Sequence, residues 1–394
     1  MSDSVTRPAT SSFLHDVVVI GAGPAGGLAA LLLAREGLNV LLVDRRPFPR
    51  YKVCGACLNA RALATLRSAN LEDEVRSLPG IPLNRVSFSS GGRRLQLPLP
   101  EGLAVARDRL DAVIVEAGLQ AGVEFIQETT ATVLAGSRGL SSRSVQLTSH
   151  GMRPREVAGR VVLAADGLGQ SSLQHLPEFS HQIAPGSRIG LGATVTEFPE
   201  FYEPGSIYLA VGREGYVGLV RTAEGELNVA AAVDAAFVKR LGGPAQAAAN
   251  LLESARCPAV SALAAAEWHG TPPLTRRPSQ VASHRLLLLG DSTGYVEPFT
   301  GEGMAWALGA AELIVPLARL AVDRWDPRVG EAWTNVCRQK IGSRQRWCRM
   351  LAALVRRPWA AHPVMTILSW FPALARPLVR DINGPSRLVT SSVT

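Results

Sequence analysis

Four short apolar runs in this chain, at residues 17–20, 40–43, 161–165 and 286–289, are each followed by glycine or aspartate. Uninterrupted apolar runs of this length are typical of parallel strands that are buried on both faces. Between the third and fourth runs, residues 176–280 contain strand-like segments with few charged groups, such as IYLAVGREGYVGLV. The pattern predicts an α/β protein that also contains a mainly β-sheet region.

The first run opens a strand–turn–helix–strand segment, HDVVVIGAGPAGGLAALLLAREGLNVLLVD. Gly21, Gly23 and Gly26 fit the pattern G-x-G-x-x-G. The first glycine permits a tight turn, the second lets the backbone approach a pyrophosphate, and the third lets the helix pack on the strand. Pro24 and Ala25 lie at the expected helix start, where free N–H groups and the helix dipole favour phosphate. The segment predicts a dinucleotide-binding unit.

An acidic residue follows the second strand of this unit. Asp44, followed by Arg45, ends the second strand, and a carboxylate at this place accepts hydrogen bonds from an adenosine ribose. One such unit does not distinguish FAD from NAD, and a glycine-rich turn without any ligand is the structural alternative.

The fourth run belongs to a second strand–loop–helix segment, HRLLLLGDSTGYVEPFTGEGMAWALGAAELI. Its strand ends at Gly290 and Asp291, where a short acid beside glycine can bind a hydroxyl of a sugar chain. The next helix can direct its N-terminal amides at a second phosphate or at the edge of a flavin ring. A purely structural turn is the alternative. The candidate ligand contacts after the strand are Pro298, Gly301, Glu302, Gly303 and Met304.

Together these segments resemble the glutathione-reductase-type FAD fold that is shared by aromatic hydroxylases, flavin halogenases and geranylgeranyl reductases. Two middle motifs agree, because VARDRLDAVIVEAGLQAGVEF is similar to the R-x-x-L-D helix of the family and VVLAADGLGQSS to its D-G strand end. The resemblance implies FAD as the cofactor, with Arg107 beside its phosphates and Asp166 and Gly167 near it. It also implies a discontinuous Rossmann-like FAD-binding domain with an inserted, mainly antiparallel substrate domain.

Within this fold, FPRYKVCGACLN resembles the K-x-C-G-G-x-L run of the geranylgeranyl reductase branch, and TGEG at 300–303 is also similar to that branch. The resemblance implies that Lys52, Cys54 and Gly55 lie by the flavin and that an alkene of a lipophilic, isoprenoid- or polyketide-like molecule is reduced. A monooxygenase that hydroxylates an aromatic or polyketide substrate is the alternative. A non-catalytic or protein-modifying FAD-binding factor is the second alternative.

One departure bears on the substrate. The branch usually has an aromatic-x-Trp-x-Phe-Pro motif, whereas the matching stretch here keeps Tyr216 but has Gly218 in place of the tryptophan. Loss of the tryptophan opens volume, which favours a bulkier or aromatic ligand. No second G-x-G-x-x-G is found, so NAD(P)H is expected to bind transiently as the reductant, with a protein electron donor as the alternative.

The spacing of Cys54 and Cys57 also fits a redox dithiol or half of a zinc site. No second C-x-x-C is present to complete a zinc site, so no metal is expected. In the flavin interpretation Cys57 falls at a variable position. The candidate catalytic residues are Cys54, Tyr216 and Glu302, and His269 is a further candidate proton donor.

The chain has 394 residues and a net charge of +8, carried almost wholly by arginine. No basic tract is interleaved with aromatics in the manner of a nucleic-acid module, which argues against nucleic-acid binding. Five scattered cysteines favour a reducing compartment, and no signal peptide is visible. We therefore expect a cytoplasmic protein, either free in the cytoplasm or in contact with the inner surface of the membrane.

That contact is suggested by residues 332–380, which contain nine Lys or Arg, no Asp or Glu, and four tryptophans. Such a segment can lie on an anionic membrane surface. It can equally form a helical cap on the FAD-binding domain or bind a partner protein. No apolar run is expected to be long enough, roughly 18 residues, to span a membrane.

The motifs divide the chain into four predicted parts. They are a disordered tail (1–12), an FAD-binding domain (13–75, 105–175 and 280–330), a substrate domain (76–104 and 176–279) and a C-terminal helical region (331–394).

Overall fold

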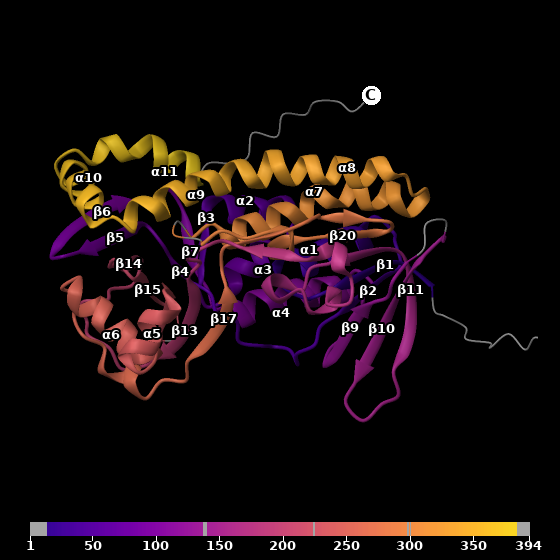
Figure 1. The fold of residues 1–394 in the computed structure, drawn as a ribbon, viewed down its shortest axis with the longest axis horizontal. Helices are drawn as coiled ribbons and strands as arrows, with labels where there is room; N and C mark the ends of the chain where they lie inside the picture. Colours follow the sequence, from indigo (N-terminus) through magenta and orange to yellow (C-terminus); the bar gives the residue numbers. More distant parts are fainter. Residues whose placement is uncertain (1–13, 137–139, 224, 298, 300, 384–394) are drawn as a thin grey trace, which may run out of the picture.

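The computed structural model describes residues 14–136, 140–223, 225–297, 299 and 301–383 (Figure 1). The tail predicted over residues 1–12 and the predicted ligand contact Pro298 lie outside these ranges.

The four apolar runs form the centre of an eight-stranded mixed sheet. Its parallel core has the order β20–β11–β1–β2–β8, and a β9–β10 hairpin joins β11 in antiparallel fashion. Val18 lies in register with Val162 and Leu41, and all three are fully buried. The strands are β1 (Leu14–Ile20), β2 (Val40–Val43), β8 (Glu124–Ile126), β9 (Thr129–Val133), β10 (Arg143–Ser149), β11 (Arg155–Ala164), β19 (Ala282–Ser283) and β20 (Leu286–Leu288).

Both faces of this sheet are covered by other parts of the chain, and this explains why its central strands are apolar throughout. Val17 and Val19 face a core that includes α1 and α7, whereas Val18 and Ile20 face the β9–β10 hairpin and the segment after β11. The helices on this part of the molecule are α1 (Pro24–Arg35), α2 (Ala60–Ser68), α3 (Glu72–Ser77), α4 (Arg107–Gln120), α7 (Gly303–Asp323) and α8 (Pro327–Val336).

Among the described residues, α7 is long and apolar enough to cross a membrane by length and composition, which corrects the expectation of no such segment. It packs against α1, α2 and α8, and 56% of its apolar window is buried. The apolar surface of α7 is therefore largely used by the core of this protein.

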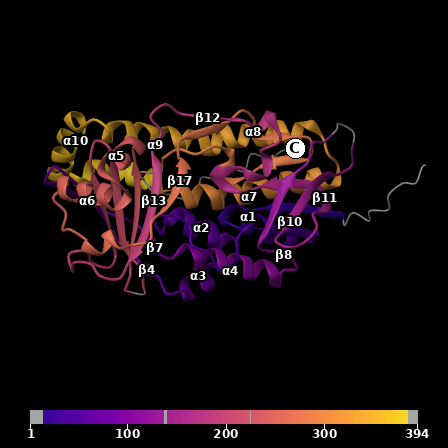
Figure 2. The same ribbon diagram turned by 60° about the horizontal axis from the view of Figure 1, so that its bottom comes forward.

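A second sheet of seven strands lies beside the first (Figures 1 and 2). Its order is β17–β13–β16–β15–β14–β5–β6, and every neighbouring pair is antiparallel except β14 with β5. Its strands are β5 (Arg85–Ser90), β6 (Arg93–Pro98), β13 (Ile189–Val195), β14 (Ser206–Val211), β15 (Gly215–Arg221), β16 (Leu227–Val233) and β17 (His269–Pro273). Helices α5 (Ala235–Leu241) and α6 (Pro244–Ser254) follow β16, and α6 packs against β14 and β15.

Two small sheets complete the strand structure. Strands β3 (Cys57–Asn59), β7 (Gly102–Ala104) and β4 (Ile81–Pro82) pair in that order, and β12 (His181–Ile183) pairs with β18 (Arg276–Pro278). The predicted α/β class and the predicted C-terminal helices are confirmed, and the two large sheets are mixed.

The C-terminal helices cover the outer strands of the second sheet. They are α9 (Gly342–Val355), α10 (Pro358–Trp370) and α11 (Arg376–Asn383), with a 3-10 turn, η7 (Pro372–Ala375), before α11. Figure 1 shows them above β5 and β6, and both α10 and η7 contact β6. Of the alternatives that the sequence leaves for this region, a cap on the FAD-binding domain agrees with the placement of α9 and α11, because Cys348 bonds to Glu302 and Arg61 of α2 bonds to Asp381. Helix α10 packs on the second sheet.

Candidate functional site

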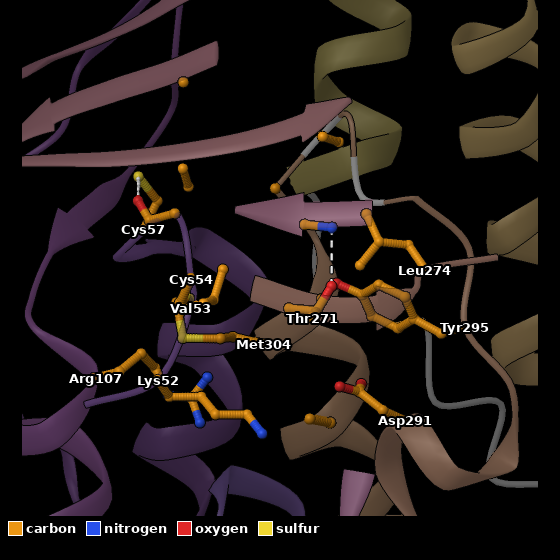
Figure 3. Close-up of a pocket in the computed structure, with 18 of the residues that line it drawn as sticks. Lys52, Val53, Cys54, Cys57, Arg107, Thr271, Leu274, Asp291, Tyr295 and Met304 are labelled. Carbon is orange, nitrogen blue, oxygen red and sulfur yellow. Dashed lines mark hydrogen bonds between the residues drawn. The ribbon is translucent and has the colours of Figure 1, made fainter. Parts of the chain in front are cut away.

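One cavity of about 930 Å³ runs from the glycine turn after β1 to the C-terminal helices. Its wall combines the carboxyl ends of β1, β2 and β11, the cysteine loop, one face of the second sheet, and α9 to α11. Figure 3 shows side chains from the cysteine loop, the start of α4, the segment from Thr271 to Leu274 and the segment from Asp291 to Met304 around one space. Ligands of open α/β sheets bind at the carboxyl ends of the strands, and this cavity lies there.

The glycine turn has the geometry that phosphate binding requires. Gly21 has φ +103°, and a Cβ on it would lie 2.4 Å from the carbonyl oxygen of Ala165. A Cβ on Gly26 would lie 1.9 Å from the carbonyl oxygen of Gly21, so α1 can pack here only with glycine. Gly23 differs, because the nearest atoms to its Cβ position are the guanidinium ends of Arg50 and Arg107, at 3.8 and 3.9 Å. The turn is closed toward the sheet and faces cationic groups at Gly23.

Those two guanidinium groups are held by buried carboxylates. Arg107, the first residue of α4, donates to both carboxylate oxygens of Asp111, at 3.1 and 2.9 Å. Arg50 donates to Asp111 at 3.1 Å and to Asp44 at 3.3 Å. Burial alone would lower the pKa of Arg107, but the Asp111 charge and Cys54 raise it, so the guanidinium stays charged. Sequence reasoning missed Arg50, although it lies within the FPRYK run.

Asp44 has a second task, since its carboxylate accepts from the backbone N–H of Ala22 at 2.8 Å and from that of Arg46 at 3.0 Å. These bonds tie the end of β2 to the glycine turn. Asp44 is 7% exposed, whereas the neighbouring Arg45 is exposed at the cavity edge.

Lys52 and Asp291 point into the same space from opposite walls (Figure 3). Burial, Arg107 and Arg50 lower the pKa of Lys52. Burial raises the pKa of Asp291, and the charges of Lys52 and Arg107 oppose that rise. Burial also raises the pKa of Asp166, whose carboxylate accepts from the backbone N–H of Ser172 at 2.8 Å. This region can therefore meet both anionic and hydroxyl groups.

The two cysteines of the loop have different surroundings. Cys54 lines the cavity near Arg107, and its backbone oxygen accepts from the Asn228 side chain of β16 at 3.0 Å. The Cys57 thiol donates to the backbone oxygen of Gly55 at 2.9 Å. Burial raises the pKa of Cys57, so its thiol stays protonated. Figure 3 shows the two side chains in different parts of the wall, and both cysteines are free thiols.

Glu302 lies elsewhere than expected. Its carboxylate is 3% exposed and is absent from the cavity lining in the described structure. It accepts from Arg61 at 3.2 Å and from the Cys348 thiol at 3.3 Å. The prediction of Glu302 as a proton donor at the site is therefore corrected, because the carboxylate joins the loop to α2 and α9.

Most of the other predicted ligand contacts are brought together. Gly26 packs against the turn, and Gly290 packs against Ala25, whose Cβ lies 2.7 Å from the Cβ position of the glycine. Neither is part of the cavity wall. The predicted residues that do line it are Gly21, Gly23, Pro24, Ala25, Asp44, Arg45, Lys52, Cys54, Gly55, Arg107, Asp166, Gly167, Tyr216, Asp291, Gly301, Gly303 and Met304.

The far half of the cavity is apolar. Alternate residues of β14 and β15, such as Leu209 and Val220, face it, whereas Val217 faces a separate core against α6. The strand pattern therefore reflects a cavity on one face and ordinary core on the other. Gly218 lines this half, and a Cβ there would lie 3.3 Å from a terminal methyl of Leu209. Leu209 thus borders the space that a larger side chain at Gly218 would enter.

Two tyrosines, the buried Tyr216 and the half-buried Tyr295, stand between the charged and apolar halves. Burial and Glu297 raise the pKa of Tyr216 well above its ordinary value, and burial and Asp291 do the same for Tyr295. Both hydroxyls therefore hold their protons at neutral pH. Tyr295 was missed by sequence reasoning. Its hydroxyl lies 2.9 Å from the Cβ position of Gly303, so glycine lets this ring approach the start of α7. His269 also lines the cavity, stacked on Tyr51 with ring centroids 4.6 Å apart.

Comparison with known proteins agrees with this geometry. Residues 15–320 match the family described as FAD binding domain. The chain belongs to this family. It is 30% identical over 371 residues to the menaquinone reductase of Mycobacterium tuberculosis, covering 87% of this chain and 84% of that protein. It is 26% identical over 350 residues to digeranylgeranylglycerophospholipid reductase 1 of Methanothermobacter thermautotrophicus, covering 83% of each. The protein is an FAD-dependent oxidoreductase, as its motifs predicted.

Solved structures share the fold. A flavin-dependent brominase matches with a TM-score of 0.76 over 94% of each chain, at 17% identity. The p-nitrophenol 4-monooxygenase of Pseudomonas putida matches with a TM-score of 0.74 over 95% of this chain and 99% of that one, at 14% identity. At such identities these likenesses establish architecture alone.

The residues present fit FAD. The turn at Gly23 and the start of α1 would hold its diphosphate together with Arg50 and Arg107, and Asp44 lies where an adenosine ribose is expected. The wall from Lys52 to Gly55 and from Gly301 to Met304 would then hold the flavin end.

Proposed function

We propose that this FAD-dependent oxidoreductase is a reductase that saturates a carbon–carbon double bond of a lipophilic, isoprenoid-like small molecule. The observation that carries the proposal is the apolar half of the cavity, which continues from the predicted flavin end and is walled by aliphatic and aromatic side chains. Such a wall suits a molecule with little polar surface. Two curated relatives, named as reductases of menaquinone and of a digeranylgeranyl lipid, support the reductase class.

Bound FAD would supply the electron pair as hydride, which the protein side chains lack the chemistry to provide. Reduction of a double bond also needs one proton for the second carbon. Tyr216 and Tyr295 are candidates for holding that proton, because both line the cavity and have raised pKa values. Lys52 would contact the flavin end of the cofactor and Asp291 the hydroxyls of its sugar chain, and the apolar wall would exclude water.

Hydroxylation is the second candidate function. Gly218 stands where reductases of this branch usually have tryptophan, and it lies on the cavity wall. The added room favours a bulky or aromatic ligand, on which an oxygen-dependent reaction is also feasible. We retain NAD(P)H, or a protein electron donor, as the proposed source of electrons.

Dependence on oxygen separates the two functions. The holoenzyme is incubated with NADPH, NADH or a ferredoxin, together with menaquinone or a geranylgeranylated lipid, with and without oxygen. The proposal predicts a product that gains two hydrogens across a double bond of its isoprenoid chain, located by fragmentation, in the absence of oxygen. A product that gains an oxygen atom, formed only with oxygen present, would establish the monooxygenase instead. Bound flavin that shows no turnover with any of these electron donors would indicate a non-catalytic binding factor.

A further inference from the structure

The outer face of α10 is apolar, which is unusual for a helix on a protein surface. Trp359, Ile367 and Trp370 are 76%, 49% and 73% exposed, and Phe371 and Leu374 beyond the helix are 60% and 62% exposed. The spacing along α10 places its three residues on one side, because steps of four and three residues return to the same face. A helix that only capped a core would present polar residues there. We name these five residues the outer face.

The inner face of the same helix is apolar for a different reason. Ala361, Met365 and Leu368 line the cavity, so α10 separates the cavity from the outer face by the thickness of one helix. Figure 1 shows α10 and α11 at one end of the molecule, over β5 and β6.

Apart from Asp381, the exposed charged side chains of residues 342–383 are arginines. Arg346, Arg349, Arg357, Arg376 and Arg380 are exposed, and none forms an ion pair with another residue in the part of the chain that the structure describes. The sequence from 332 to 380 contains no acid, and Asp381 follows directly after Arg380. Exposed aromatic and aliphatic side chains flanked by unpaired arginines are the surface that an anionic bilayer attracts.

A hollow lies beside this surface. It has a volume of about 160 Å³ between the end of β6 and η7, and Arg376 and Arg380 form part of its rim. Leu97, Leu99 and Ala375 line both the hollow and the main cavity. A side chain that lines two spaces is a wall between them, so movement of a few aliphatic groups would join the hollow to the cavity.

The rest of the cap is fixed to the protein. Glu297, 2% exposed, accepts from the fully buried Arg188 at 2.8 Å and from Arg356 at the end of α9 at 3.2 Å. Arg61 donates to the backbone oxygen of Asp381 in α11 at 2.6 Å. These bonds hold α9 and α11 on the site while α10 presents its outer face.

We propose that the outer face and its arginines dock on an anionic lipid bilayer, and that the lipophilic substrate enters the cavity from the bilayer through the hollow between β6 and η7. The docking stands on the surface alone, whereas the entry route rests on the proposed function.

Vesicle sedimentation tests the docking. Holoenzyme is mixed with vesicles of phosphatidylcholine alone or with phosphatidylglycerol added, at low and high salt. Binding is expected only with phosphatidylglycerol and should weaken with salt. The double variant Trp370→Ser/Phe371→Ser should bind these vesicles far less. The affinity of Arg376→Glu/Arg380→Glu for the vesicles should fall about fivefold or more for each positive charge removed.

Matched controls lie away from the cap. Met152→Ser removes an apolar side chain that is 71% exposed, and Arg153→Glu/Arg155→Glu changes the net charge equally. Both should bind as the unaltered protein does. Arg356 is not used, because it is bound to Glu297. Absence of binding to phosphatidylglycerol vesicles, or equal loss in the controls, would overturn the docking and would leave the outer face to a protein partner.

The entry route is tested with substrate in two forms. Reduction of menaquinone or a geranylgeranylated lipid is measured in vesicles and in detergent micelles. The Trp370→Ser/Phe371→Ser variant should lose most of its activity on substrate in vesicles and retain its activity on substrate in micelles, because neither residue lines the cavity. If the variant keeps the same fraction of the unaltered enzyme's activity in vesicles as in micelles, the entry route is overturned. Failure of the unaltered enzyme in micelles as well would refute the proposed function and leave the vesicle-binding result intact.

Discussion

At one end of the cavity, beside β1 and α1, the wall consists of charged side chains that hold one another in place. Arg50 and Arg107 share the buried carboxylate of Asp111, and a turn that tolerates no Cβ at Gly26 presses against the sheet. At the other end, under α10, the wall consists of aliphatic and aromatic side chains contributed by separate parts of the chain. The first end has little freedom, whereas the second could be changed by single substitutions without loss of the fold.

The difference follows from what each end must recognise. A dinucleotide presents the same charged groups in every member of the family, so the charged end is specified by backbone conformation and paired ions. An apolar ligand is recognised mainly by shape, so volume and side-chain size decide what fits. Substitutions at the two ends should therefore fail in different ways.

The largest expected effect comes from Gly26→Ala. The new Cβ would lie 1.9 Å from the carbonyl oxygen of Gly21, and the turn would have to move. We expect protein that is insoluble or that carries no flavin, measured by visible absorbance after purification. Gly309→Ala in α7 is the control, because its Cβ meets nothing within 4 Å and alanine favours a helix by up to about 1 kcal/mol. Normal flavin content in Gly26→Ala would contradict the assigned role of the turn.

Arg107→Ala should be the next most damaging. It removes one of two guanidinium partners of Asp111, which is 1% exposed, and breaking a buried ion pair costs about 3 kcal/mol of unfolding free energy. We also expect FAD affinity to fall about tenfold to a hundredfold, by titration of the FAD-free protein. Arg107→Lys should recover part of the affinity. Unchanged affinity in both variants would show that Arg107 does not contact the cofactor.

Gly218→Leu should leave the charged end intact. Its side chain would meet Leu209 and fill cavity volume, so FAD should bind normally while KM for a bulky substrate rises about tenfold or more. Gly218→Ala, with its Cβ 3.3 Å from Leu209, should have a smaller effect. Steady-state kinetics with substrates of two sizes provide the test. A loss of FAD with no change in KM would contradict the placement of Gly218 in the apolar half of the cavity.

The two cysteines sharpen the boundary between the ends. Cys54→Ser should lower turnover about tenfold or more with FAD retained, because Cys54 lines the cavity near Arg107. Cys57→Ser should leave turnover unchanged, because its thiol is protonated and bonded to Gly55. The reverse result would show that Cys57, and not Cys54, takes part in turnover.

The smallest effect concerns pH. Burial raises the pKa of Asp291 above its ordinary 3.8, so the folded protein binds this proton more tightly than the unfolded chain. Its stabilising contribution is complete below pH 3.8 and is lost as the pH rises through the raised value. FAD-free Asp291→Asn should therefore melt slightly higher than the unaltered protein at pH 7. The difference in melting temperature between the two proteins should vanish toward pH 4. A difference that grows as the pH falls would contradict the raised pKa of Asp291.

The charged end could be predicted from the sequence because its residues are set by local geometry. Gly21, Gly23 and Asp44 follow from one strand–turn–helix segment, and the structure gathers them as that segment implies. Arg50 could not be predicted, since its two partners lie 6 and 61 residues away and meet it only when the cysteine loop folds back.

The apolar end depends on contacts between distant segments. No pattern in α10 indicates that it lies on β6, and the orientation of Glu302 toward Arg61, 241 residues away, follows from the packing of α2 against α7. Sequence periodicity shows which face of a helix is apolar but not which surface that face covers. The sequence of residues 332–380 therefore fits a cap, a membrane-binding segment and a partner-binding segment equally.

The central claim is tested most directly by a single turnover without oxygen. Holoenzyme with photoreduced flavin is mixed with menaquinone or a geranylgeranylated lipid in micelles, and flavin absorbance and product mass are followed together. The account predicts that the flavin reoxidises and that one product molecule forms per flavin, with two hydrogen atoms added across a double bond of the isoprenoid chain and not to the quinone ring. Flavin that stays reduced until oxygen is admitted, followed by a product carrying an added oxygen atom, would contradict it.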